Sequence, residues 1–148
     1  MSGAELSLER IYVRDASFES PRSPEVFREH WKPNIQLDIN TRANSLGEER
    51  FEVVLTATIE AKSDAGQTLL IVEVQQAGVF RIRGLSADNL RRVLATQCPT
   101  ILFPYIREAV DSMMTRGGFP ALHLVPVNFD AMFEEALKQR TAPPTVQH

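Results

Sequence analysis

Residues 50–61 read RFEVVLTATIEA, and this stretch indicates how the chain folds. Apolar side chains recur at every second position, and polar ones fall on the alternate positions: the apolar set is Phe51, Val53, Leu55, Ala57 and Ile59, and the polar set is Glu52, Thr56, Thr58 and Glu60. A two-residue period places successive side chains on opposite faces of a β-strand. The stretch therefore predicts a strand with one buried face and one face in contact with water.

Three other segments extend this pattern on either side. Residues 34–40 (NIQLDIN) alternate in the same way, residues 6–20 mix apolar with charged side chains, and residues 68–82 follow a turn at KSDAGQ. No connection between these strands contains a helix of the length that a parallel crossover needs. Residues 21–33 (PRSPEVFREHWKP) hold three prolines, so we expect a loop with at most one helical turn. The sheet should be antiparallel, with one solvated face.

The second half of the chain has helical character. Ser86 is placed to cap a first helix, and Pro99 and Pro104 are expected to interrupt or kink the helical run that follows. A strong helical pattern extends over residues 105–116, and Gly117 is the expected C′ residue. Strands followed by helices predict an α+β domain in which helices cover one face of the sheet.

A loop (GFPALHLVPV) and a last helix close the domain. Asn128 is the expected cap of that helix, because apolar residues then recur with helical spacing. The predicted organisation is one domain over residues 1–140 and a disordered tail over residues 141–148.

Composition limits the classes of function. The 148 residues carry a net charge of −3, which argues against nucleic acid as the main partner. The single cysteine, Cys98, excludes an intrachain disulfide and favours a reducing cytoplasm. The N-terminus does not have the pattern of a signal peptide, and no apolar run approaches the roughly 20 residues that span a bilayer. We therefore expect a cytoplasmic protein that does not insert directly into a membrane.

The sequence offers no constellation of catalytic residues. His30, His123 and His148 do not have the spacing of a metal pair, and glycine-rich phosphate loops are absent. Cys98 lies in an apolar run, which favours a buried structural thiol over a nucleophile. The sequence thus predicts no metal, no cofactor and no enzymatic activity.

The apolar side chains of residues 101–114 form a stripe wider than half a helical turn. Such a stripe can bury against the chain's own sheet, a second copy of the chain or a client. The loops also carry Phe27, Trp31, Phe119 and Leu122, and apolar loops are typical of a partner surface or a groove. Periodicity alone therefore does not distinguish a stripe that forms the core from a stripe that contacts a partner.

Several motifs together resemble the SecB family of export chaperones of Gram-negative bacteria. They are RIYVRDASFESPRSPEVF, FEVVLTATIEA, EVQQAGVF, CPTILFPY and PVNFDA, and the resemblance extends from about residue 8 to residue 137. It implies a four-stranded antiparallel sheet with two main helices on one face, assembling as a dimer of dimers. The residues expected at the interface of that homotetramer are Tyr105, Ile106, Ala109, Val110 and Met113.

The resemblance also implies a function. Members of this family are ATP-independent chaperones that bind unfolded preproteins, keep them competent for translocation and deliver them to the SecA ATPase for export through SecYEG. The implied client groove contains Phe27, Trp31, Phe119, Leu122 and Leu124, with Trp31 and Phe119 partly accessible before a client binds. The implied SecA contact consists of Asp15, Glu19, Ile71 and Glu73.

Asp15, Glu19 and Glu73 can also be an ordinary solvated strand face, and a SecB-like chaperone dedicated to a toxin–antitoxin pair is the alternative function. The C-terminal residues 137–148 (LKQRTAPPTVQH) are mildly basic and rich in proline, whereas in some members of the family the tail that contacts SecA is acidic.

Overall fold

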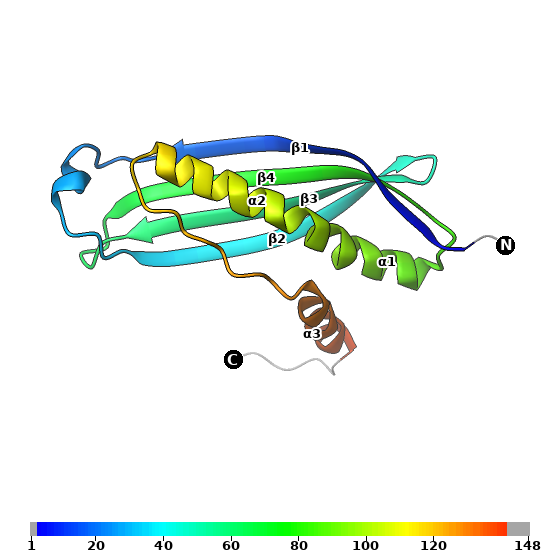
Figure 1. Cartoon of the computed structure of the whole chain (residues 1–148). Coiled ribbons are helices and arrows are strands. Elements are labelled where there is room, and N and C mark those ends of the chain that lie inside the picture. Colours follow the sequence, from blue (N-terminus) through cyan, green and yellow to red (C-terminus); the bar gives the residue numbers. More distant parts are fainter. Residues whose placement is uncertain (1–2, 142–148) are drawn as a thin grey trace.

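The computed structural model describes residues 3–141. Its four strands are β1 (Glu5–Glu19), β2 (Asn34–Gly47), β3 (Arg50–Lys62) and β4 (Thr68–Arg83). They form one antiparallel sheet in the order β1-β4-β3-β2, so the first two strands lie at opposite edges (Figure 1). The chain joins these edges by crossing one end of the sheet through a short 3₁₀-helix, η1 (Glu25–Arg28). The predicted antiparallel sheet and the single helical turn are confirmed.

Pairing register divides the sheet into two faces. On β3 and β4, Leu55, Ala57 and Ile59 lie beside Val72 and Val74, and all five belong to the hydrophobic core. We call this the core face and the opposite side the open face. Alternation in residues 50–61 thus predicts the sidedness of the sheet correctly, because a strand's two-residue period fixes which side chains can be buried together.

Three helices follow the sheet: α1 (Ala87–Ala95), α2 (Gln97–Arg116) and α3 (Phe129–Thr141). Helices α1 and α2 lie across the core face, and α2 packs mainly on β3 and β4 (Figure 1). Ser86 caps α1 as predicted, since its Oγ accepts the N–H of Asn89 at 3.2 Å. The predicted α+β fold class is therefore confirmed.

The predicted start of the long helix is wrong. Helix α2 begins at Gln97, and the chain breaks at Thr96 (φ −124°, ψ −67°) instead of at the prolines. Pro99 occupies the first turn of α2, where its missing N–H costs no intrahelical bond. Pro104 is accommodated within the helix, where buried neighbours such as Leu102 and Ile106 hold the helix against the sheet.

The C′ residue of α2 is Gly118, not Gly117. Gly118 has a left-handed φ of 88°, whereas Gly117 has a φ of −80°. The N–H of Phe119 donates to the carbonyl of Met114 at 2.9 Å, and the N–H of Gly118 donates to that of Thr115 at 3.1 Å. This pair of bonds is a Schellman motif, which satisfies carbonyl groups that the helix itself leaves free.

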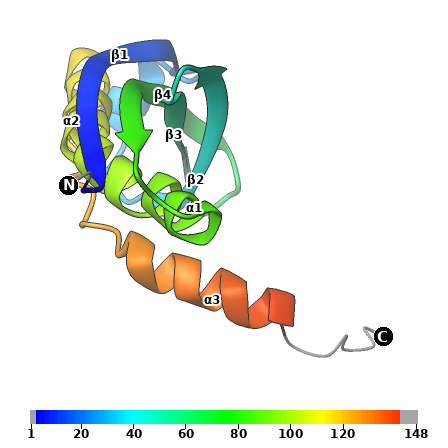
Figure 2. The same cartoon turned by 90° about the vertical axis from the view of Figure 1, so that its right-hand side faces the viewer.

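Helix α3 lies beside α1 and extends away from the sheet (Figure 2). Asn128 caps it as predicted, with Oδ1 accepting the N–H of Ala131 at 2.9 Å. Arg92 links the two helices through an ion pair to Glu134 at 2.5 Å and lies over the ring of Phe133. Residues 142–148 of the predicted tail lie outside the described residues.

Candidate functional site

Four aromatic side chains from three distant segments meet at one end of the sheet. The ring of Phe119, just beyond α2, has its centroid 5.1 Å from that of Trp31, 5.4 Å from Phe27 and 6.2 Å from Phe18. The structure thus brings together three of the five predicted groove residues, and it adds Phe18 of β1. The alternation of β1 could have indicated Phe18, because it places this side chain on the core face. In the structure, its register partner Val72 belongs to the core.

Exposure differs among the predicted groove residues. Phe27 is 51% exposed, and Trp31 and Leu122 are partly buried against the core. Phe119 and Leu124 are 5% and 3% exposed. The expectation that Phe119 is accessible in the free chain is therefore wrong, because the three other rings and the end of α2 surround it. Phe119 organises the aromatic cluster, and Phe27 offers its surface.

The glycine pair after α2 allows the aromatic rings to approach the helix end. A Cβ on Gly117 would lie 2.1 Å from the ring of Phe18, and a Cβ on Gly118 would lie 2.9 Å from that of Phe27. Distances below 3.0 Å are not tolerated without movement. The sequence RGGFP therefore ends the helix and leaves room for the aromatic cluster.

Asp111 of α2 anchors the segment that follows the cluster. Its Oδ1 accepts the backbone N–H groups of Leu122 and His123, both at 3.0 Å, and its Oδ2 lies 3.3 Å from Nδ1 of His123. His123 has a φ of 56°, an unusual conformation that these bonds stabilise. A hollow of about 440 Å³ lies between this segment and α2, lined in part by Pro104 and Arg107. Sequence reasoning missed Asp111, because nothing local marks a carboxylate that acts eleven residues away.

The four predicted SecA-contact residues lie together on the open face. In the register of β1 and β4, Glu19 is opposite Ile71, and Glu73 is opposite Ser17, which lies between Asp15 and Glu19. The carboxylate of Glu73 accepts a hydrogen bond from Thr58 Oγ1 at 3.0 Å. An acidic surface therefore spans two neighbouring strands, with one of its carboxylates held in place.

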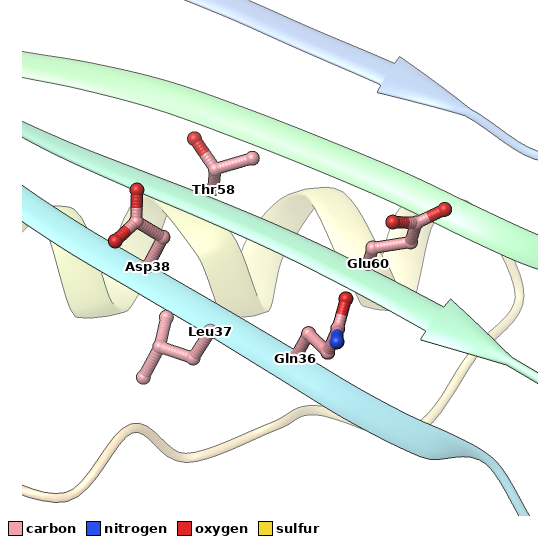
Figure 3. A pocket seen from close by; sticks show the side chains of 5 residues that line it. All are labelled: Gln36, Leu37, Asp38, Thr58 and Glu60. Carbon is pink, nitrogen blue, oxygen red and sulfur yellow. The ribbon is translucent and has the colours of Figure 1, made fainter. Parts of the chain in front are cut away.

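Two further carboxylates continue this acidic surface across β3 and β2. Asp38 lies opposite Thr58, and Glu60 lies opposite Gln36. Figure 3 shows these four side chains on the same side of the sheet, with Leu37 on the other side and the helix behind. They line a shallow hollow of about 370 Å³. Sequence reasoning missed Asp38 and Glu60, because it did not align the two hairpin strands.

The predicted tetramer-interface residues divide between two sides of α2. Ile106 and Val110 are fully buried against the chain's own sheet, whereas Tyr105 is 48% exposed. Ala109 and Met113 are partly buried beside the core. Because a fully buried side chain cannot contact a second subunit directly, the residues available to a partner are Tyr105, Ala109 and Met113.

Cys98 and the histidines are the remaining residues that the sequence singles out for possible chemistry. Cys98 is buried, as predicted, and burial raises the pKa of its thiol to about 12. Within residues 3–141, no three acidic, histidine or cysteine side chains gather as metal ligands would. Over the same residues, no helix combines the length and apolar character needed to cross a membrane.

The sequence is similar to that of a known protein family over almost its whole length. The family model described as "Preprotein translocase subunit SecB" matches residues 2–140. The protein-export protein SecB of Stutzerimonas stutzeri is 53% identical over 135 residues, which cover 91% of this chain and 82% of that protein. The SecB of Pseudomonas aeruginosa is 50% identical over 138 residues, covering 93% and 85%.

A solved structure shows the same fold at lower identity. A SecB-like chaperone of Mycobacterium tuberculosis, in complex with a peptide from an antitoxin, superposes with a TM-score of 0.65 at 19% identity. The match covers 83% of this chain and 91% of that one. The family model and the close relatives together show that this chain belongs to the SecB family of protein-export chaperones.

Proposed function

We propose that the chain holds unfolded preproteins in a groove at the aromatic end of the sheet and passes them to SecA for translocation through SecYEG. The observation that carries this proposal is the cluster around Phe119, which joins the crossover at Phe27 and Trp31 to the segment after α2. Two loops that are about ninety residues apart in sequence thereby form one apolar surface.

The exposed parts of this surface suit a client without fixed structure. Phe27 is 51% exposed, and Val125, farther along the segment after α2, is 75% exposed. An aromatic ring supplies contact area with little loss of rotamer freedom, and repeated weak contacts along an extended chain add up through their number. Such binding requires no nucleotide and no catalytic group, which supports an ATP-independent chaperone rather than an enzyme.

The acidic surface of Asp15, Glu19, Ile71 and Glu73 is the proposed docking site for SecA. Charges on an exposed, flat sheet face attract a basic partner over roughly 10 Å at 0.1 M salt. Thr58 holds Glu73 in one orientation, so the partner does not have to order that side chain. Ile71 contributes apolar area beside these charges.

We further propose that the chain assembles as a homotetramer, a dimer of dimers, in the cytoplasm. Tyr105, Ala109 and Met113 form the outward side of α2, where a second helix layer can pack. Strands β1 and β2 are both edges of the sheet, and β1 alone has 15 residues. Long uncovered edge strands favour pairing with another chain, which supports assembly.

A charge reversal tests the SecA site. Glu73→Lys should weaken SecA binding roughly two- to fivefold at low salt while leaving client binding and assembly mass unchanged. Glu135→Lys on α3 is the control for the change of charge, because Glu135 is exposed and lies off the sheet. Equal SecA affinity for wild type and for the Asp15→Lys, Glu73→Lys double variant would remove this surface from the proposal.

The alternative function is that of a chaperone for one antitoxin. Identifying the clients that the protein captures distinguishes this alternative from export. Export predicts many envelope preproteins, whereas the alternative predicts one dominant antitoxin. The relatives that are about half identical to the chain carry the name protein-export protein, which favours export.

A further inference from the structure

The open face of the sheet carries opposite charges at its two ends. At the end near η1 lie five carboxylates, which we call the acidic half: Asp15, Glu19, Asp38, Glu60 and Glu73. Toward the other end, register and ion pairing place six arginines on the same face. The outermost, Arg83, is paired with Glu5 at 2.6 Å, and we call the other five the basic half: Arg10, Arg14, Arg42, Arg50 and Arg81. We propose that the basic half is a second docking surface and that it takes an acidic polypeptide segment.

Only two of these arginines are neutralised within the face. Arg14 pairs with Glu52 at 2.6 Å, and Arg50 pairs with Glu9 at 2.7 Å. Tyr12 also donates to Glu52 at 2.5 Å, so that carboxylate is fully engaged. With five arginines against two glutamates, the basic half keeps three uncompensated positive charges.

Those three charges belong to Arg10, Arg42 and Arg81, for which the described residues provide no ion pair or side-chain hydrogen bond. Arg81 lies opposite Arg50 in the β3–β4 register, and its Nε is out of contact with water and has no acceptor within residues 3–141. Like charges directly opposite each other in a sheet are destabilising, and an unsatisfied buried donor is costly. An incoming carboxylate would relieve the charge repulsion.

The hairpin that joins β2 and β3 does not supply this carboxylate. Its Glu48 lies 3.5 Å from Arg50, which is already paired, and its own side chain is 89% exposed. Glu49 is also exposed, in the same turn beyond the strands. At the opposite end of the open face, Lys62 ends β3 beyond Glu60, so the acidic half also has a basic residue at its edge.

The spacing of the two halves favours a polypeptide over other polyanions. Arg81 follows Glu73 on β4 by eight residue steps, which corresponds to about 27 Å at roughly 3.4 Å per residue. A nucleic acid duplex or an anionic membrane carries one sign of charge over a longer distance and would be repelled by the acidic half. A polypeptide can present carboxylates over a patch of this size and change its charge beyond it.

The test uses a twelve-residue peptide of alternating glutamate and glycine, with a glutamine version as control. Calorimetry measures its binding to the full chain at about 0.02 M and 0.2 M salt, where the Debye length falls from roughly 20 Å to below 10 Å. The variant carries Arg10→Gln, Arg42→Gln and Arg81→Gln. The matched control replaces three arginines off the open face, Arg28, Arg116 and Arg140, and so changes net charge equally.

We expect the glutamate peptide to bind at low salt and the triple variant to lose at least about tenfold in affinity, with the control close to wild type. Chemical shifts of β3 and β4 amides in the wild-type chain should move on titration, which tests the site even if the variant folds poorly. No binding at low salt, or equal losses in both variants, overturns the proposal. Tighter binding of a phosphatidylglycerol vesicle or a DNA duplex than of the peptide overturns the choice of partner.

The peptide experiment tests the basic half independently of the proposed SecA site. The glutamate peptide carries no basic residue and therefore does not engage Asp15 or Glu73. Retained peptide binding in Glu73→Lys would leave the basic half standing whatever that substitution does to SecA.

Discussion

The sharpest test of the groove contrasts two aromatic rings that touch each other. Phe119 and Phe27 lie 5.4 Å apart between ring centroids, yet one is 5% exposed and the other 51% exposed. If Phe119 organises the cluster and Phe27 contacts the client, alanine at each position should affect a different property. We expect Phe119→Ala to destabilise the fold and Phe27→Ala to weaken client binding.

The magnitudes follow from burial. Truncating a buried phenylalanine costs about 3–5 kcal/mol, which in a chain of this length lowers the thermal midpoint by roughly 10–15 °C. The exposed half of Phe27 amounts to about 100 Å², worth at most about 2.5 kcal/mol on burial. Because ordering the client opposes this gain, about 1–2 kcal/mol should remain, which is roughly a five- to thirtyfold loss of affinity.

Trp31 provides the readout, since it is the only tryptophan and its ring lies 5.1 Å from that of Phe119. An unfolded, reduced preprotein should shift wild-type Trp31 emission to the blue, and Phe119→Ala should shift it to the red without any client. Thermal midpoints are compared at one subunit concentration, because assembly contributes to stability. Unchanged client affinity in Phe27→Ala, together with an unchanged midpoint in Phe119→Ala, would refute the reasoning.

Three further predictions concern the helix layer and the open face. Met113→Asp should lower the mass of the assembly while its subunits stay folded, whereas Ile106→Asp should unfold the chain because Ile106 is fully buried. Light scattering measures the mass and circular dichroism the folding. A full-sized assembly of Met113→Asp would contradict the proposed interface. Gly118→Ala should lower the free energy of unfolding by about 1–2 kcal/mol in urea, because its φ of 88° is left-handed; no loss would mean that the turn adjusts freely. Burial and, second, the hydrogen bond to Glu52 raise the pKa of Tyr12 from 10.0 to about 12. The free energy of unfolding should therefore fall as pH rises between these two values, because mainly the unfolded state loses the proton there. A Tyr12→Phe variant with the same pH dependence of stability would exclude this cause.

The sequence determined the local features of this protein. The alternation in residues 50–61 assigned the side chains of β3 to its two faces, with the exception of the apolar and fully buried Val54. Ser86 and Asn128 marked the starts of α1 and α3. These predictions succeeded because a two-residue period and a capping side chain act within a few residues. The predicted start of α2 was wrong because a proline is favourable in the first turn of a helix and disruptive in later turns. The local pattern does not show which turn is the first.

Tertiary structure alone decided what forms the candidate sites. The sequence identified Phe27, Trp31 and Phe119 as unusual loop residues, but the crossing of the chain between opposite edges of the sheet determines that they meet and that Phe119 is the buried one. Likewise, strand order and register join carboxylates of four strands into the acidic half and leave Arg81 opposite Arg50. Periodicity fixes the face of a strand on which a side chain lies, whereas its neighbours on that face depend on which strands pair and in what register.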